Sequence, residues 1–208
     1  MLTRKLSPQT INRRLAVVRR ILNIAYREWE WITEPIGQKI KLLSERGMAR
    51  EFFLTKAEVE ALLSEITDEE AYKVIYLSAY TGLRRGEILK LRKNQWKTPY
   101  ITLDNKTKSG RPRTVPVIEE LQPLVTLPFN LTEHQLRVAF EKARTAIGKP
   151  HIRFHDLRHT FASWLAENPD IPFTVIRDLL GHSNLTVTSK YTHLRGTTYK
   201  MINAALKK

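Results

Sequence analysis

Five short segments of the chain carry side chains that could act together on an anionic ester. They hold Arg84 in TGLRRGEIL (81–89), Lys108 in KTKSG (106–110), His155 and Arg158 in HDLRHT (155–160), His182 in LGHSN (180–184) and Tyr191 in KYTH (190–193). A guanidinium binds phosphate oxygens through a planar fork, and imidazole moves protons near pH 7. A Lys in a hairpin could deliver a proton to a leaving oxygen, and a phenol is a nucleophile once it is assisted.

Each segment also has a plain structural interpretation when it is taken alone. Arg84 could be a solvated residue at a helix start, Lys108 a common turn residue, and Tyr191 a packing residue. His155 and His159 stand four residues apart and could hold zinc, but the H-E-x-x-H pattern is absent. We therefore expect neither a metal nor a cofactor.

The composition favours a nucleic-acid partner. The chain has 208 residues with 35 Lys or Arg and 21 Asp or Glu, a net charge of +14, and 42% hydrophobic residues. That apolar content argues against a disordered polycation, and a folded basic domain typically binds a polyanion. No apolar run approaches the roughly 20 residues that cross a bilayer. With no Cys, the chain has no disulfide and no cysteine nucleophile.

The positive charge is distributed unevenly along the chain. Residues 1–50 hold 11 Lys or Arg and 4 Asp or Glu, so a quarter of the length carries half of the excess positive charge. The polar stretch 45–51 is typical of a linker. We predict an N-terminal piece over 1–44, a linker over 45–51 and a larger domain over 52–208.

The N-terminal piece is expected to be one amphipathic helix. Ser7 is a suitable N-cap, Pro8 suits the first helical position, and an apolar stripe continues to Trp29, which places the helix at about 8–30. The stripe predicts that Trp29 is a core residue. A single helix cannot bury such a stripe alone, so either it packs on the larger domain or its own partner helices are missing.

The larger domain is predicted to be α+β, mostly helical with one small antiparallel sheet. Capping boxes at Thr55–Glu58 and Thr132–Gln135 begin two helices, and Gly82 and Gly181 end two others. Alternation predicts a hairpin of two strands. The predicted helices are 55–66, 71–80, 85–91, 132–147, 155–166, 172–180, 186–193 and 198–206, and the predicted strands are 100–103 and 113–117.

In this order, the five segments closely resemble the motifs of the tyrosine recombinases, also called the phage integrase family. The resemblance covers about 50–208, and its six catalytic positions fall on Arg84, Lys108 (with Lys106 as the alternative), His155, Arg158, His182 and Tyr191. The stretch 1–45 resembles the end of the family's helical core-binding domain, most of which is absent. The fold expected is therefore a helical catalytic domain preceded by a helix of a truncated core-binding domain.

The resemblance implies metal-free and ATP-free cleavage and rejoining of DNA. Arg84 and Arg158 would hold the phosphate, and His182 would add a donor. Tyr191 would attack to give a 3′-phosphotyrosyl bond, with Lys108 protonating the 5′-oxygen. His155 would exchange a proton with the tyrosine, and Glu87 would orient an arginine. Tyr199 is a rival nucleophile that lies outside the motif.

Two other functions stay open at this point: a DNA-binding fragment without efficient turnover, and a type IB topoisomerase-like enzyme. The resemblance also implies double-stranded DNA as partner, a tetramer on synapsed sites with a monomer or weak oligomer alone, and a cytoplasmic, nucleoid-associated location in a bacterial host. The apolar segment 196–208 could dock on a neighbouring copy or fold back on its own domain, and the sequence favours neither.

Overall fold

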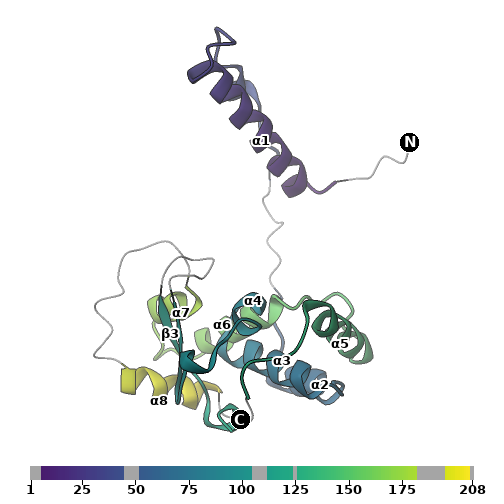
Figure 1. Cartoon of the computed structure of the whole chain (residues 1–208), viewed down its shortest axis with the longest axis vertical. Helices are drawn as coiled ribbons and strands as arrows, with labels where there is room; N and C mark the ends of the chain where they lie inside the picture. The colour runs from purple at the N-terminus through teal and green to yellow at the C-terminus, as the bar shows by residue number, and fades with distance from the viewer. Residues whose placement is uncertain (1–5, 45–51, 105–111, 124–125, 182–194, 207–208) are drawn as a thin grey trace. The chain divides into compact units, whose positions relative to one another are not determined.

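A computed structural model of the chain describes residues 6–44, 52–104, 112–123, 126–181 and 195–206. The chain forms two compact units, Met1–Glu51 and Phe52–Lys208 (Figure 1).

The N-terminal unit is one long helix with a return segment. Helix α1 (Pro8–Arg27) starts as predicted, because Ser7 caps it and Pro8 occupies its first turn. It ends earlier than the predicted 30, and Glu30 has a φ of 53°. The return segment contains a short 3₁₀-helix, η1 (Ile36–Lys39). The side chain of Asn12 bonds both the N–H and the C=O of Leu43, which fastens the segment to α1.

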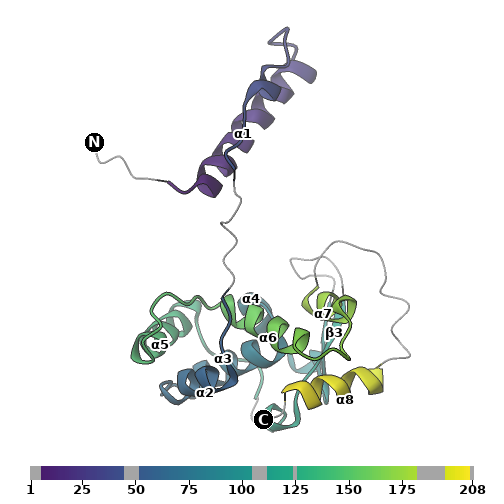
Figure 2. The same ribbon diagram turned by 180° about the vertical axis from the view of Figure 1, so that it is seen from behind.

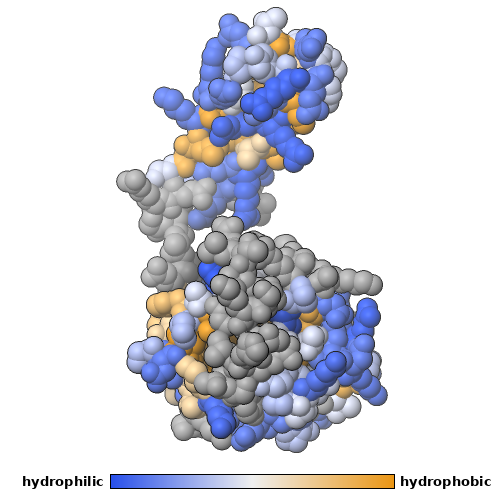
Figure 3. Space-filling view, turned by 90° about the vertical axis from the view of Figure 1, so that its left-hand side faces the viewer, coloured by the Kyte–Doolittle hydropathy of each residue, from blue (hydrophilic) through white to orange (hydrophobic). Residues whose placement is uncertain are grey.

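The prediction that Trp29 belongs to a core is wrong. Trp29 is 46% exposed, and its ring lies at a tilt against that of Trp31, which is 74% exposed, with ring centroids 4.5 Å apart. Val18, on the same stripe, is also exposed. Helical periodicity showed that these residues share a face, but the described part of this unit offers only a narrow return segment to cover it. Figure 3 shows apolar surface on this unit beside strongly hydrophilic surface.

The C-terminal unit is mostly helical with one small sheet, as the fold class predicted (Figures 1 and 2). Its helices are α2 (Lys56–Ser64), α3 (Glu69–Thr81), α4 (Arg85–Ile88), α5 (Glu133–Ala146), α6 (Asp156–Ala166), α7 (Phe173–Leu180) and α8 (Arg195–Leu206), with 3₁₀-turns η2 (Lys93–Gln95) and η3 (Glu119–Leu121). Both predicted capping boxes are present, at the starts of α2 and α5. Helix α4 is a single turn, shorter than the predicted 85–91.

The sheet has three antiparallel strands in the order β1 (Trp96–Lys97), β2 (Tyr100–Leu103) and β3 (Arg113–Pro116). In β2 and β3, Ile101 pairs with Val115 and both are buried. The sequence predicted these two strands and missed β1, because a strand of two residues shows no alternation. Leu103 pairs with Arg113, which places this arginine in the same inward-facing row as Val115.

Helices α3 and α6 pack against each other in the centre of the unit. Phe161 of α6 and Leu77 of α3 are fully buried there. Gly82 ends α3 in the left-handed conformation, with φ 63°, and Gly181 ends α7 in the same way, with φ 64°. Both predicted helix stops are therefore confirmed.

Helix α8 packs on α6 of its own domain, where Ile202 and Leu206 are each 1% exposed. Lys56 donates to the carbonyl of Ala205 and holds the last turn. In the structure the segment therefore lies on its own domain, and docking on a neighbouring copy stays a prediction. The predicted helix 186–193 lies outside the described residues. In the described ranges, no helix is long and apolar enough to cross a membrane.

The close approach at Gly82 generates a stability prediction. A Cβ there would lie 2.5 Å from Cδ1 of Phe161 on top of the left-handed strain, so Gly82→Ala should lower the free energy of unfolding by about 2–4 kcal/mol. Gly148 has a φ of 71° but open space around it, and Gly148→Ala should lose only about 1–2 kcal/mol. Urea denaturation of both variants checks this, and equal losses would contradict it.

Candidate active site

Arg84 is fixed by the turn between α3 and α4. The left-handed Gly82 lets the chain reverse, and Arg84 follows as the residue before α4. The carboxylate of Glu87 then bonds Arg84 twice: Oε2 accepts the backbone N–H at 2.9 Å, and Oε1 accepts Nη1 at 2.9 Å. Because both ends of the arginine are bonded, its guanidinium has little freedom to turn. The sequence-based expectation that Glu87 orients an arginine agrees with this contact.

Arg158 reaches the same region from helix α6. It lies in the first turn of α6 and is only 3% exposed. Its Nη1 donates to the carbonyl of Gly82 at 2.7 Å, and its Nη2 donates to the carbonyl of Leu180. Arg158 therefore joins the turn before Arg84 to the last turn of α7.

The two arginines meet at the C-terminal end of α7. Nη2 of Arg84 approaches the carbonyl of Gly181 at 3.5 Å, one residue beyond the carbonyl that Arg158 binds. The last carbonyls of a helix carry partial negative charge, which favours cations at this place. Each guanidinium keeps further N–H groups beyond these contacts. The arrangement can offer a pair of cationic donors to an anion.

Arg113, which the sequence analysis did not select, is the third arginine of this cluster. Its Nη2 lies 2.6 Å from Oε2 of Glu87, and its Nε donates to the carbonyl of Leu179 at 2.9 Å. Arg113 lies outside the five motif segments, so the sequence predicts it only as the start of a strand. The two-residue period of β3 could have shown that it faces inward with Val115.

Burial and the charges of this cluster shift the pKa of Glu87 and of Arg158. Burial raises the pKa of Glu87, but the bonds and charges of Arg113 and Arg84 outweigh it, so the pKa lies below its ordinary value of 4.5. Burial and the nearby Arg84 and Arg113 lower the pKa of Arg158 to about 9. Near pH 7 all these groups are charged, with Glu87 as the anion among three cations.

His155 is the residue immediately before α6, three positions ahead of Arg158. It is exposed, and its ring meets that of His159 edge-on, with centroids 5.1 Å apart. Desolvation, then the charges of His159, Arg158 and Arg84, lower the pKa of His155 below 6.5. The imidazole is therefore neutral near pH 7 and able to accept a proton.

Lys108, its alternative Lys106, His182 and Tyr191 lie outside the described residues, so the structure does not place four of the selected side chains. Among the selected residues the structure brings Arg84 and Arg158 together, and His155 lies three residues before Arg158 in the sequence. In the described part of the chain, no group of three or more His, Cys, Asp or Glu side chains could hold a metal.

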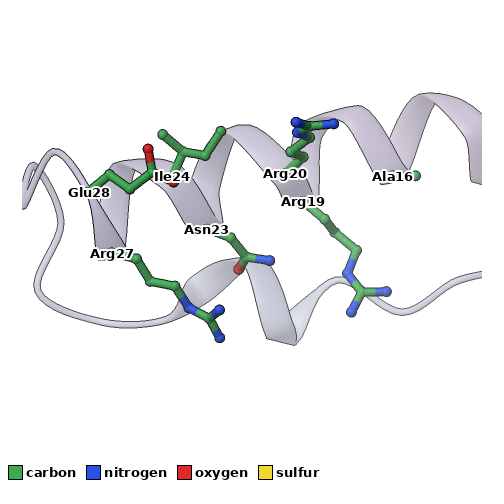
Figure 4. Close-up of a pocket in the computed structure, with 7 residues that line it drawn as sticks. All are labelled: Ala16, Arg19, Arg20, Asn23, Ile24, Arg27 and Glu28. Atoms are coloured by element: carbon green, nitrogen blue, oxygen red, sulfur yellow. The ribbon is translucent and has the colours of Figure 1, made fainter.

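A separate basic feature lies within the N-terminal unit. An open cavity of about 390 Å³ runs along α1 and is lined by Ala16, Arg19, Arg20, Asn23, Ile24, Arg27 and Glu28 (Figure 4). Three of these residues are arginines, whereas the side chains suited to phosphate chemistry belong to the other unit. This cavity is therefore a candidate surface for binding an anion and not a place for catalysis.

Comparisons with known proteins agree with the motifs. The model of the phage integrase family matches residues 129–197. The integrase of Escherichia phage 186 is 30% identical over 199 residues, which cover 91% of this chain and 58% of that protein. The catalytic domain of bacteriophage HP1 integrase superposes with a TM-score of 0.54 at 25% identity, covering 76% of this chain and 91% of that domain. This chain belongs to the phage integrase family of tyrosine recombinases.

A second phage relative agrees on the family, and a further solved structure shares the fold. The integrase of Haemophilus phage HP1 is 30% identical over 190 residues, 88% of this chain and 56% of its own length. The Tn1549 transposon integrase, solved in complex with circular intermediate DNA, shares the fold with a TM-score of 0.65 at 21% identity, over 93% of this chain and 79% of that one. This family member spans less than two thirds of the length of either phage relative.

The carboxylate of Glu87 should stabilise this recombinase-family domain. Glu87→Gln leaves Arg84 and Arg113 without their anion, so we expect a loss of about 3–5 kcal/mol in unfolding free energy at pH 7. Because the folded pKa is depressed, this stabilisation is present above pH 4.5 and is lost as the pH falls through the folded pKa. Between pH 7 and pH 3, the free energy of unfolding of Glu87→Gln should therefore fall by less than that of the wild type.

Urea denaturation between pH 3 and pH 7 measures this effect. Glu141→Gln is the matched control, because Glu141 pairs with Arg137 on the solvent-exposed side of α5. A surface pair of this kind contributes about 0–1 kcal/mol. Similar losses in the two variants would contradict the role given to Glu87.

The environment of His155 predicts its titration. We expect a folded-state pKa below 6.5, and an upward shift in His159→Gln, which removes one of the charges that lower it. NMR titration of the imidazole carbon protons in both proteins measures these values. A wild-type pKa above 6.5 would show that partial desolvation and the neighbouring charges do not act on this ring as described.

Proposed function

We propose that this chain is the catalytic part of a site-specific DNA recombinase that cuts and rejoins strands through a 3′-phosphotyrosyl intermediate. The observation that carries the proposal is the convergence of Arg84 and Arg158 at the end of α7, in the residues immediately before His182. The family of the chain and its net charge of +14 support it. DNA is an anion whose scissile phosphate matches such a pair of cations.

The chemistry follows from charge development at phosphorus. As the nucleophile approaches in line with the leaving group, negative charge is held on the non-bridging oxygens. Arg84 and Arg158 neutralise these oxygens and are already oriented before the reaction, so little reorganisation is needed. We assign to His182 a further hydrogen bond to the same phosphate.

Three further residues complete the proposed step. The phenol oxygen of Tyr191 forms a bond to phosphorus while the bond from phosphorus to the 5′-oxygen breaks. His155, which is neutral near pH 7, accepts the phenol proton, and Lys108 gives a proton to the departing 5′-oxygen. The phosphotyrosyl bond retains the energy of the broken ester, so rejoining reverses the same step without ATP and needs no metal.

The arginines that line the cavity on α1 fit a second contact with the DNA backbone. Arg19, Arg20 and Arg27 belong to a unit in which Lys and Arg strongly outnumber the acids. We propose that this unit, residues 1–44, is the end of a core-binding domain and that it strengthens DNA binding in a salt-dependent way. Residues 45–51 would then be the linker to the catalytic domain at 52–208.

We further propose that four copies act on two synapsed double-stranded sites and that free chains are monomers or weak oligomers. The chemistry supports assembly, since each copy supplies one nucleophile and an exchange of two duplexes cuts four strands. Relatives from phages and bacteria support a place of action on DNA in the cytoplasm of a bacterial host, at the nucleoid.

Trapping the covalent intermediate tests the proposal. Incubation with a library of nicked duplexes in EDTA should give a protein–DNA adduct that maps to Tyr191 and is lost in Tyr191→Phe. Tyr199→Phe is the matched control and should retain the adduct. An adduct that persists in Tyr191→Phe would show that the nucleophile is another residue.

The same experiment separates the alternative of a binding fragment. DNA binding that weakens steeply with salt, together with no adduct in the wild type on any duplex, would contradict turnover by this chain. The N-terminal unit leaves apolar residues such as Val18 and Trp29 exposed. If no adduct forms, this uncovered apolar surface favours the interpretation that the chain is a DNA-binding fragment.

A further inference from the structure

Arg113 is a buried cation that the chemistry above does not use. Its side chain is 6% exposed, and Nη1 has no hydrogen-bond partner among the residues that the structure describes. Removing a guanidinium from water costs several kcal/mol, and a single carboxylate shared with Arg84 offsets this only in part. A buried charge that costs this much stability indicates that the protein needs the geometry which the charge fixes.

The contacts of Arg113 join three separate elements. The residue opens β3, bonds Glu87 of α4 through Nη2, and bonds the carbonyl of Leu179 in α7 through Nε. A single planar group makes both bonds, so the distance between the carboxylate and the last turn of α7 is set by the width of a guanidinium.

The same carboxylate oxygen then reaches Arg84. Oε2 of Glu87 accepts Nη2 of Arg113 at 2.6 Å and the backbone N–H of Arg84 at 2.9 Å, while Oε1 accepts Nη1 of Arg84. The guanidinium of Arg84 in turn approaches the carbonyl of Gly181. The bonds form a closed path from β3 through Glu87 and Arg84 to the end of α7 and back through Leu179.

Gly181 packs closely against the side chain of Arg113. A Cβ at this position would lie 3.0 Å from Cδ and from Nη1 of Arg113. Arg113 therefore contacts the turn that ends α7, the same turn that Arg84 and Arg158 bind. A shorter side chain would leave both Glu87 and this turn without a support.

We propose that Arg113 is a positioning residue, which holds Glu87 against the end of α7 and thereby sets the direction in which Arg84 meets the scissile phosphate. The inference rests on the proposed function for the identity of the anion. Arg113 acts through Glu87 and does not touch DNA. Its loss lowers the rate of strand cleavage and leaves DNA affinity nearly unchanged.

A first experiment reads the position of Arg84 without DNA. Amide hydrogen exchange of the full-length chain, followed by NMR, reports the N–H of Arg84 that Glu87 accepts. In Arg113→Met this amide should exchange at least about tenfold faster, with the buried Leu62 of α2 unchanged. The lysine of Arg113→Lys can reach only one of the two acceptors, so the exchange rate of the Arg84 amide should lie between those of the wild type and Arg113→Met.

The control for this experiment is Arg137→Met, which removes an arginine that is 53% exposed on α5. Its Arg84 amide should exchange as in the wild type. An unchanged Arg84 amide in Arg113→Met would overturn the proposal. Faster exchange throughout the core of that variant would also overturn it, because this would show a general role in stability.

A second experiment measures single-turnover cleavage at saturating DNA. Arg113→Met should cleave on the order of 100-fold more slowly, with a DNA dissociation constant within about twofold of the wild-type value. Arg113→Lys should recover part of the rate. The double variant with Glu87→Gln should be no slower than Glu87→Gln alone, since both changes remove the same link.

The outcomes separate this inference from the proposed function. Multiplied losses in the double variant would overturn it by showing that Arg113 acts independently of Glu87, as a direct phosphate ligand would. Failure of the wild type to form any adduct would contradict the proposed function alone, and the exchange of the Arg84 amide would still decide whether Arg113 positions Arg84.

Discussion

The carboxylate of Glu87 holds the arginine cluster together, because it is bonded to both Arg84 and Arg113 in a region that excludes most of the water. Its two oxygens fix Arg84 at the backbone and at the guanidinium, and they hold Arg113 against it. Without this anion the cations would repel one another at short range, where the interior screens charge poorly. The buried pairs of Glu87 with Arg84 and Arg113 therefore fix the directions of both guanidinium groups as well as contributing to stability.

Two left-handed glycines make this arrangement possible. Gly82 turns the chain so that its carbonyl faces Arg158 and the next residues begin α4, and Gly181 ends α7 so that its carbonyl faces Arg84. Helix ends present unpaired carbonyls, and here the arginines bond some of them. The cations are therefore positioned by backbone atoms, which move less than side chains, and this suits a site that must be oriented before the reaction.

The sequence predicted much of the domain because its strongest signals are local. Capping boxes, glycine stops and motif spacing located the helices around Arg84 and Arg158, and each of these features acts within a few residues. It could not predict the exposure of Trp29, since periodicity names a face and not what covers it. It missed Arg113 because the role of that residue depends on Glu87, which is 26 residues away in the chain. Lys108, His182 and Tyr191 stay predictions from the motifs.

The central claim is that Arg84 and Arg158 neutralise the scissile phosphate, and a substrate with a neutral phosphate tests it most directly. In a methylphosphonate duplex, one non-bridging oxygen at the cleavage site is replaced by a methyl group, so the negative charge is gone. The cleavage rates of wild type, Arg84→Met and Arg158→Met are compared on this duplex and on ordinary DNA. The account predicts that each variant is far slower than the wild type on ordinary DNA and regains most of that loss on the neutral one. Equal defects on both substrates would contradict it, because the arginines would then act on something other than the phosphate charge.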